Sequence, residues 1–378
     1  MAPGQRPQSL FNAGGAARRL QASGLLTIGP SAPGPALKRG ALVAVPVGIA
    51  LLVELGLNTS SKGAIATGAL LAGFPGLDAP AQTRAAWQAA VAPAIGLMAA
   101  LGVLSSQSPV TAVLAMAVVG AAAGYCFAVS LRLAIAGLTV ALSLLIAQGL
   151  FLSPGDALPA LLLATMGGLL QATFSLCVWL LGDRDGEAAE KAWSSRDARR
   201  ELATNLSLRS TSFRHGLRFG AALAAGVAVY RLLDMDQHGF WIPLTILFVM
   251  RPEEDETFHR LVLRAVGTAF GLVIATALAE ALGGEGVAVA LALTAATAFA
   301  YGLLTVQYAL FTAAITTYAV LLADSLGEGA LHAAGQRGWA TAIGIVISGA
   351  AFLLWPNPGE GRGSRAGRPE PTPNAAAR

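Results

Sequence analysis

The chain has 378 residues, of which 55% are hydrophobic and only 12% are charged, with a mean hydropathy of +0.62 and a formal net charge of +4. A soluble domain usually carries charge on about a quarter of its residues, because its surface must meet water. This composition excludes a water-soluble globular domain of this length and indicates an integral membrane protein. The 44 glycines suit helices that pack closely in lipid.

The two ends of the chain differ from the rest. Residues 1–36 are rich in Gly, Pro, Ala and Arg, and residues 357–378 are similar. We predict disordered tails at both ends, and the first has no apolar core that would make it a signal peptide. Between the tails lie ten apolar segments of about membrane-spanning length. These segments lie near 38–57, 84–104, 107–126, 132–152, 156–182, 214–233, 257–282, 285–303, 305–324 and 330–355.

Two further apolar segments, near 62–74 and 238–250, are only about a dozen residues long. At ~1.5 Å per residue, a helix of that length reaches little more than halfway across the hydrocarbon core. A half-span with free backbone groups is tolerated only where protein or a water-filled cavity surrounds it. We therefore expect both short segments inside the bundle.

The two halves of the apolar region repeat the same order of long and short segments. The stretch "LKRGALVAVPVGIALLVELG" at 37–56 aligns with "LRFGAALAAGVAVYRLLDMD" at 217–236. The pattern predicts an all-α polytopic membrane protein with two parallel six-helix repeats, 37–182 and 213–356, related by a pseudo-two-fold axis. A charged cytoplasmic linker at 183–212 joins them. Chance resemblance between Ala- and Leu-rich helices is the alternative.

Charge predicts the orientation. If all twelve segments change sides, all but three of the 25 Lys and Arg residues fall on the side of the N-terminus. The exceptions are Lys62, Arg231 and Arg337. Because cytoplasmic loops carry an excess of Lys and Arg, both termini are predicted to be cytoplasmic.

The second short segment ends in a cluster of charges. Pro252 suits the first position of a helix, and the acids of 253–256 suit its first turn, where the helix dipole favours negative charge. Arg260 follows the last acid at i+4 spacing, and Arg264 follows Arg260 in the same way. We interpret this as a capped helix start with a ladder of ion pairs. A compatible alternative is a cytoplasmic vestibule in which Arg251, Arg260 and Arg264 attract carboxylates.

Three residues of the short segment are candidates for contact with a solute. Trp241 either anchors at the outer membrane interface or stacks on an aromatic substrate, and Thr245 offers a hydroxyl. Pro243 lacks an amide proton and suggests a discontinuous helix near a site. Pro46 and Pro93 are expected to break two helices of the first half in the same way.

Ionisable residues in apolar segments are further candidates, because charge in hydrocarbon is costly and usually faces a cavity or a partner. Glu54 and Arg231 lie near the outer ends of corresponding helices and are expected to face one another. Glu54 and Asp324 are the candidates for proton coupling. The alternative for residues near the outer ends, which include Glu280, is a solvated side chain at the membrane surface.

With these residues in view, "FWIPLTILFVMRPEEDETFHRLVLRAVGTAFG" at 240–271 resembles the signature of the fusaric acid resistance (FUSC) and aromatic acid exporter family. The resemblance implies a location in a bacterial inner (plasma) membrane and export of aromatic or other organic acids across it, driven by the proton gradient. The candidate substrate and pathway residues are Trp241, Pro243, Thr245, Arg251, Arg260, Arg264, Thr268 and Arg231.

Two other functions stay open. The family resembles the plant aluminium-activated malate transporters, which implies a passive organic-anion channel between the two repeats as one alternative. A non-transporting membrane scaffold is the other. Longer family members carry a cytosolic domain after the first six helices, where this chain has only the linker of about 30 residues.

Several features are expected to be absent. No Walker A loop, HExxH, GxSxG or Cys/His cluster is present in the sequence, so we predict neither an enzyme nor a metal or cofactor site. The four histidines are expected to be loop or interface residues. Basic segments point to anionic lipid headgroups rather than nucleic acid. Two halves in one chain allow a functional, pseudo-dimeric monomer, and a homodimer is equally compatible. Gly120-x-x-x-Gly124 and Gly267-x-x-x-Gly271 predict close helix contacts.

Overall fold

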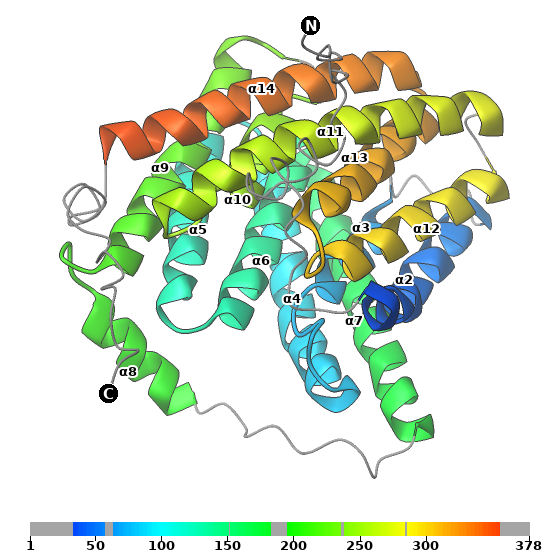
Figure 1. Cartoon of the computed structure of the whole chain (residues 1–378), viewed down its shortest axis with the longest axis horizontal. Helices are drawn as coiled ribbons and strands as arrows, with labels where there is room; N and C mark the ends of the chain where they lie inside the picture. Colours follow the sequence, from blue (N-terminus) through cyan, green and yellow to red (C-terminus); the bar gives the residue numbers. More distant parts are fainter. Residues whose placement is uncertain are drawn as a thin grey trace, which may run out of the picture.

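The computed structural model describes residues 33–56, 63–150, 152–182, 195–235, 238–283 and 286–355. These residues form thirteen α-helices and two short 3-10 helices (Figure 1). The first half contains α2 (Pro33–Gly56), α3 (Ala64–Gly73), α4 (Ala81–Ser105), α5 (Pro109–Tyr125), α6 (Leu131–Gly149) and α7 (Ala157–Leu181). The linker contains α8 (Ser195–Asn205). The second half contains α9 (Thr211–Leu232), α10 (Trp241–Val249), α11 (Glu254–Leu282), α12 (Val287–Leu303), α13 (Tyr308–Ser325) and α14 (Ala330–Leu354).

Eight of the described helices are long and apolar enough to cross a membrane: α2, α4, α5, α6, α7, α11, α13 and α14. The protein is therefore a multi-pass membrane protein, and these helices contact the bilayer. Each of the twelve predicted segments coincides with one helix outside the linker, with boundaries that differ by a few residues. The predicted tails lie outside the described residues, except that residues 33–36 form the first turn of α2.

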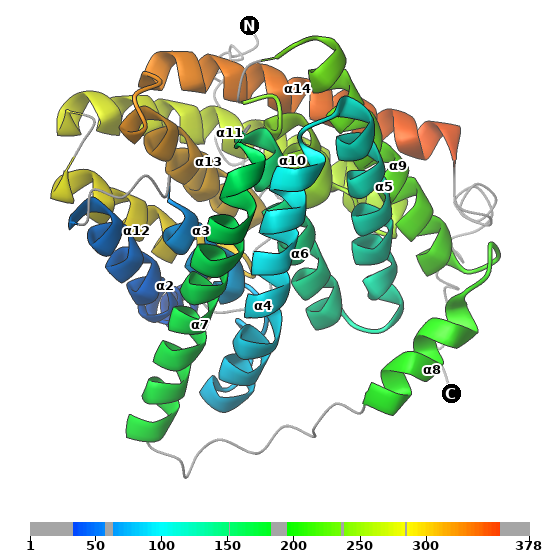
Figure 2. The same ribbon diagram turned by 180° about the vertical axis from the view of Figure 1, so that it is seen from behind.

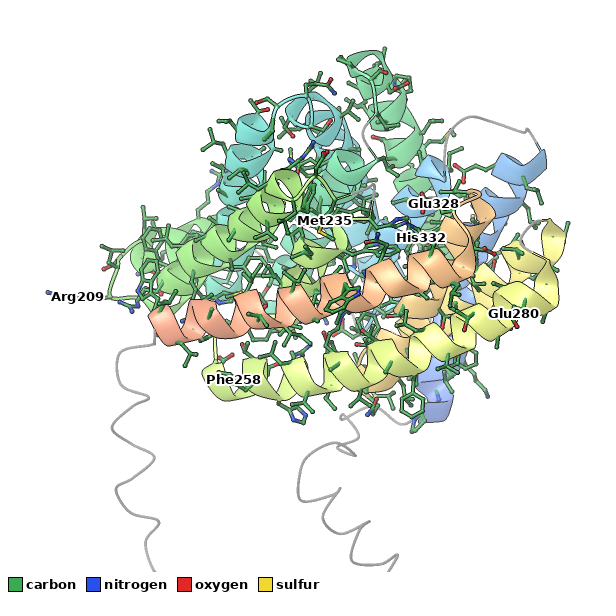
Figure 3. All side chains as sticks on the ribbon, turned by 90° about the horizontal axis from the view of Figure 1, so that it is seen from above. Arg209, Met235, Phe258, Glu280, Glu328 and His332 are labelled. Atoms are coloured by element: carbon green, nitrogen blue, oxygen red, sulfur yellow. The ribbon has the colours of Figure 1, made fainter. Side chains whose placement is uncertain are left out.

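The connections between helices gather at two ends of the bundle. At one end, Arg218 donates from Nη1 to the Trp355 carbonyl oxygen (2.9 Å) and from Nη2 to the Pro252 carbonyl oxygen (3.5 Å), close to Arg251. At the other end, Arg231 donates from Nη2 to the Ser106 carbonyl oxygen at 3.1 Å. Figure 3 shows Arg209 and Phe258 at the first end, and Glu280, Glu328 and His332 at the second. We call these the Arg251 end and the His238 end.

The two short helices lie inside the bundle, as predicted. Eight of the ten residues of α3 are buried, and so are eight of the nine residues of α10. Helix α10 occupies the middle of the bundle in both ribbon views (Figures 1 and 2). A helix too short to span the hydrocarbon core is therefore covered by protein on almost every side.

The prediction that Pro46 and Pro93 break their helices is wrong. Helix α2 continues through Pro46, and α4 continues through Pro93. A proline removes one backbone hydrogen bond, but neighbouring helices and local adjustment can compensate for this inside a membrane helix. Pro243 is the third residue of α10, where the missing amide proton is not needed by the helix. It therefore does not mark a break.

The first helix of each half packs against a helix of the other half. Helix α2 packs against α12 of the second half, and α9 packs against α5 of the first half (Figure 2 shows the second pair). Glycines allow both approaches: a Cβ on Gly40 would lie 2.4 Å from the Ala298 carbonyl oxygen, and one on Gly120 would lie 2.7 Å from the Leu223 side chain. Small residues permit this close packing.

The second predicted glycine pair also makes a close helix contact. A Cβ on Gly267 would lie 2.3 Å from the Ala309 carbonyl oxygen, and one on Gly271 would lie 2.6 Å from that of Ala313. These contacts hold α11 against α13. They fix the face of α11 on which Arg264 and Thr268 lie.

The predicted linker contains a helix of its own. Helix α8 is amphipathic, and the Tyr125 hydroxyl at the end of α5 donates to the carbonyl oxygen of Leu202. It lies at the edge of the molecule in both ribbon views. Residues 195–205 of the predicted linker therefore form a helix that contacts the bundle at the Arg251 end.

Candidate functional site

A cavity of about 130 Å³ opens between the two halves near the His238 end. Its lining comes from α3 and α6 of the first half and from α10, α13, α14 and their connections in the second half. Most of the lining is apolar or aromatic. The charged or titratable members are His238, Tyr318, Glu328 and Arg337. We call it the His238 cavity.

Arg337 is the buried cation of this cavity. It is 0% exposed, and its Cζ lies 5.2 Å from the ring centre of Trp241. Its Nε and Nη1 atoms have no hydrogen-bond partner within the part of the chain that the structure describes, and it forms no ion pair there. A buried charge without a partner is costly, and in a membrane protein it usually faces a pathway or a ligand. Arg337 is therefore well suited to receive an anion.

Trp241 and His238 form one wall of the same cavity. Trp241 is only 3% exposed, so it does not anchor the helix in the membrane interface. The His238 ring lies 4.2 Å from the Trp241 ring, and His238 Nε2 pairs with Glu328 Oε2 from the α13–α14 connection. Because α10 begins at Trp241, the start of this short helix places both rings at the cavity.

A second cavity, of about 690 Å³, lies at the Arg251 end. Arg251 and Arg260 line it together with Glu256, whose Oε1 lies 2.9 Å from Arg260 Nη2 and 3.9 Å from Arg251 Nε. The predicted Glu256–Arg260 pair is therefore present. Arg260 also lies 4.7 Å from the ring centre of Tyr308. Two of the three arginines of the basic vestibule that the sequence suggested, Arg251 and Arg260, therefore line one opening, whereas Arg264 does not line it.

Burial, together with the neighbouring charge of Arg260, lowers the pKa of Arg251 to about 9. Burial disfavours the charged form, and a like charge adds to this effect. The guanidinium still carries its charge at neutral pH. Arg251 can therefore attract an anion over the physiological pH range.

The two cavities meet at three apolar residues. Phe74, Leu142 and Phe248 line both of them. Phe248 is fixed from two sides: Tyr308 donates its hydroxyl proton to the Phe248 carbonyl oxygen at 3.0 Å, and Arg264 Cζ lies 5.3 Å from the Phe248 ring centre. The structure thus has an apolar constriction between a basic opening and a chamber with a buried arginine.

Arg264 does not extend the surface ladder of ion pairs, which corrects the prediction. It is 0% exposed on α11, one turn from the buried Thr268. None of its three guanidinium nitrogens forms a well-aligned hydrogen bond among the described residues, although the Tyr308 hydroxyl is close. The i+4 spacing correctly placed Arg264 on the face of Arg260, but packing of α11 against α13 and α14 buries that part of the face.

The remaining candidates lie elsewhere. The Thr245 hydroxyl donates to the Trp241 carbonyl oxygen (3.0 Å) rather than lining either cavity. Glu54 accepts hydrogen bonds from the backbone amides of Ile65 (2.8 Å) and Ala66 (3.4 Å), at the start of α3, and its pairing with Arg231 stays a prediction. Asp324 lies half-buried in the last turn of α13 and outside both linings.

Sequence reasoning missed three residues of the His238 cavity. His238 was expected to be an ordinary loop or interface residue, Glu328 was not considered, and Arg337 was assigned to the outer membrane surface. One signal was available for Arg337, because it lies several residues inside an otherwise apolar predicted helix. The pairing of His238 with Glu328 joins residues 90 positions apart and has no local signal.

Comparison with known proteins finds three relatives and one matching family. The chain is 37% identical over 158 residues to the inner membrane protein YccS of Escherichia coli (strain K12). These residues are 41% of this chain and 22% of YccS. It is 37% identical over 73 residues to the uncharacterized protein slr1298 of Synechocystis, covering 19% of this chain and 10% of that protein.

A third relative is the uncharacterized protein ORF2 of Neisseria gonorrhoeae, 33% identical over 95 residues, which is 24% of this chain and 22% of ORF2. The chain thus matches less than a quarter of the length of each of these relatives. No solved structure matches it. Residues 223–351, which include Trp241, Phe248, Arg264 and Arg337, match the family described as fusaric acid resistance protein-like. The second half of this membrane protein is therefore similar to the fusaric acid resistance protein-like family.

Proposed function

We propose that this protein is a secondary transporter that exports aromatic or other organic acids across a bacterial inner membrane, driven by the proton gradient. The observation that carries the proposal is the pair of cavities, both lined by the two halves, that meet at Phe74, Leu142 and Phe248. The family match supports the class of transporter, and the similarity to an inner membrane protein supports a location in a bacterial inner membrane.

The residues suggest a sequence of steps. Arg251 and Arg260 draw a carboxylate into the cavity at the Arg251 end, where fixed positive charge raises the local anion concentration. The anion then passes the constriction when Phe248 moves. Arg337 holds it in the His238 cavity, and the Trp241 ring contacts its apolar part. The side chains supply charge and shape, with no covalent chemistry.

The proposal includes the duplication and the orientation. The reciprocal packing of α2 on α12 and of α9 on α5 is the arrangement expected if a pseudo-two-fold axis relates two six-helix repeats. Arg218, Arg251 and Arg260 lie toward the Arg251 end, which supports a cytoplasmic location for that end and for both termini. Two halves then form the pathway within one chain.

The test is flux of radiolabelled benzoate in proteoliposomes that contain the full chain. Arg337→Gln should lower the proton-driven flux at least tenfold, Arg337→Lys should lower it less, and Arg199→Gln, at an exposed position on α8, should leave it unchanged. Equal flux in the Arg337 and Arg199 variants would contradict the proposal. A flux that persists with a protonophore and follows the membrane potential would favour the passive channel instead.

A further inference from the structure

A third cavity, of about 350 Å³, lies entirely within the first half, between α3, α4, α6 and α7. We call it the branch cavity. Its lining is made mainly of Ala, Ile, Leu, Pro and Met side chains. One of them, Met166, is also 49% exposed on the outer surface of α7. This cavity plays no part in the route described above.

The branch cavity adjoins the His238 cavity. Thr67 on α3 and Ile146 and Leu150 on or just after α6 line both cavities. These three side chains therefore lie between the chamber of Arg337 and the apolar space in the first half. A molecule held at Arg337 can extend toward the branch cavity if these side chains change rotamer.

The branch cavity is suited to hydrocarbon and not to a second charge. Among the residues that the structure describes, no Lys, Arg or His lines it. The Ser143 hydroxyl donates to the Ile95 carbonyl oxygen (2.7 Å), so its proton is already used. Asp156 accepts from the Ser153 amide (2.9 Å), and its negative charge would repel a carboxylate. An apolar group entering this space gains from burial, whereas an anion would lose its solvation without a partner.

We propose that the branch cavity is the subsite for the hydrocarbon portion of a monocarboxylate whose carboxylate is held by Arg337. This inference rests on the proposed function and names the substrate class more closely. The substrate is an amphipathic acid with one charged end and an apolar remainder. A dicarboxylate of similar length is a poor ligand, because its second charge would enter a cavity whose described lining holds no cation.

The experiment measures binding of a homologous series to the full chain in lipid nanodiscs. Isothermal titration calorimetry compares benzoate with 4-alkylbenzoates that carry one to six carbons in the chain. The variants are Ala99→Leu on α4 and Ala160→Leu on α7, both buried residues that line only the branch cavity among the three cavities. Ala90→Leu, at an exposed position on α4, is the matched control.

In the wild type and in Ala90→Leu, affinity should rise about fourfold for each methylene that enters the cavity. In Ala99→Leu and Ala160→Leu, whose larger side chains occupy part of the cavity, the rise in affinity should stop after the first one or two carbons. Their affinity for benzoate itself should stay within twofold of the wild-type value. Partition of the longer acids into lipid is the same in all four proteins, so it cannot produce this difference. Adipate should bind more weakly than hexanoate in every protein.

Two results would overturn the proposal, and they are distinguishable. If all four proteins bind benzoate and show the same dependence on chain length, the branch cavity does not hold the hydrocarbon portion, while the proposed function stands. This result is expected if a lipid acyl chain fills the branch cavity. If neither the wild type nor Arg337→Gln binds benzoate, the proposed function is overturned as well. A cooperative thermal unfolding transition shows that each variant is folded. Because the two substitutions lie on different helices, the test still works if one of the variants does not fold.

Discussion

The guanidinium of Arg264 lies 5.3 Å from the ring centre of Phe248, at the point where the two cavities meet. A buried cation over an aromatic face is attracted by the ring and limits its rotation. Phe248 is therefore held in the constriction by a residue that a passing carboxylate would also attract. The first two predictions concern this pair.

Replacing Phe248 by alanine should widen the constriction. We expect the Phe248→Ala variant to pass benzoate several times faster than the wild type down its own gradient, because the ring no longer fills the junction. Flux in proteoliposomes measures this. Phe270→Ala, at a position that is 64% exposed on α11, is the control and should not change the flux. Equal rates for Phe248→Ala and wild type would place the barrier elsewhere.

Replacing Arg264 by methionine should separate stability from function. A buried, unpaired charge costs several kcal/mol of solvation, roughly, and an apolar side chain of similar size removes that cost. We therefore expect the unfolding temperature of Arg264→Met to stay the same or rise, while benzoate flux falls at least tenfold. Arg209→Met, at an exposed position, should change neither quantity. A destabilised variant with normal flux would show that Arg264 has a structural role.

Glu54 is expected to stabilise α3 rather than carry protons. Its carboxylate accepts two amide hydrogen bonds at the start of that helix, and loss of such a cap costs about 1–2 kcal/mol. Glu54→Ala should lower the unfolding temperature by a few degrees but leave the pH dependence of transport between pH 5.5 and 8 unchanged. Glu201→Ala, exposed on α8, is the control. If Glu54→Gln is stable yet loses its response to the proton gradient, Glu54 is a coupling residue.

Neutralising Glu328 should strengthen anion binding. Its carboxylate lines the same cavity as Arg337 and repels a bound carboxylate. We expect Glu328→Gln to bind benzoate about 3- to 10-fold more tightly, a difference of roughly 0.7–1.4 kcal/mol. Glu280→Gln, exposed near the same end of the bundle, should bind as the wild type does. Weaker binding in Glu328→Gln would mean that this carboxylate positions His238 for the ligand.

The contact between α11 and α13 should tolerate no added atom at Gly267. A Cβ there would lie 2.3 Å from a backbone oxygen, so one helix must move. We expect Gly267→Ala to lower stability by about 1–3 kcal/mol, measured by unfolding in detergent. At Gly349 a Cβ meets nothing within 4 Å, and Gly349→Ala should be neutral or slightly stabilising. Equal stability of both variants would contradict the close packing.

The helices could be predicted from the sequence because their signal is local. Apolar runs of a given length identify membrane helices, and a run too short to span, such as Trp241–Val249, must be covered by protein. Glycine spacing likewise predicted the contacts of Gly120 and Gly267. Each of these inferences needs only the residues of one segment and the properties of lipid.

The site could be predicted only in part because its residues come from segments far apart in the chain. Arg251, Arg260 and Glu256 lie within ten positions, so local spacing could predict that the two arginines share an opening, but Arg264, predicted to join them, does not line it. Whether Arg264 faces lipid, water or protein depends on how α11 packs against two other helices. Contact of Arg337 with Trp241 depends on the placement of α14 beside α10. The continuity of α4 through Pro93 is likewise decided by neighbours rather than by the proline.

The contact of α2 with α12 has a consequence for biosynthesis. During translation α2 enters the membrane well before α12 has been made, since Gly40 and its neighbour Ala298 are 258 positions apart. The face of α2 that contains Gly40 therefore contacts lipids or other proteins until nearly the whole polypeptide has been inserted. Ribosome-bound chains that end before residue 287 should expose this face to a membrane crosslinker, and chains released at full length should protect it.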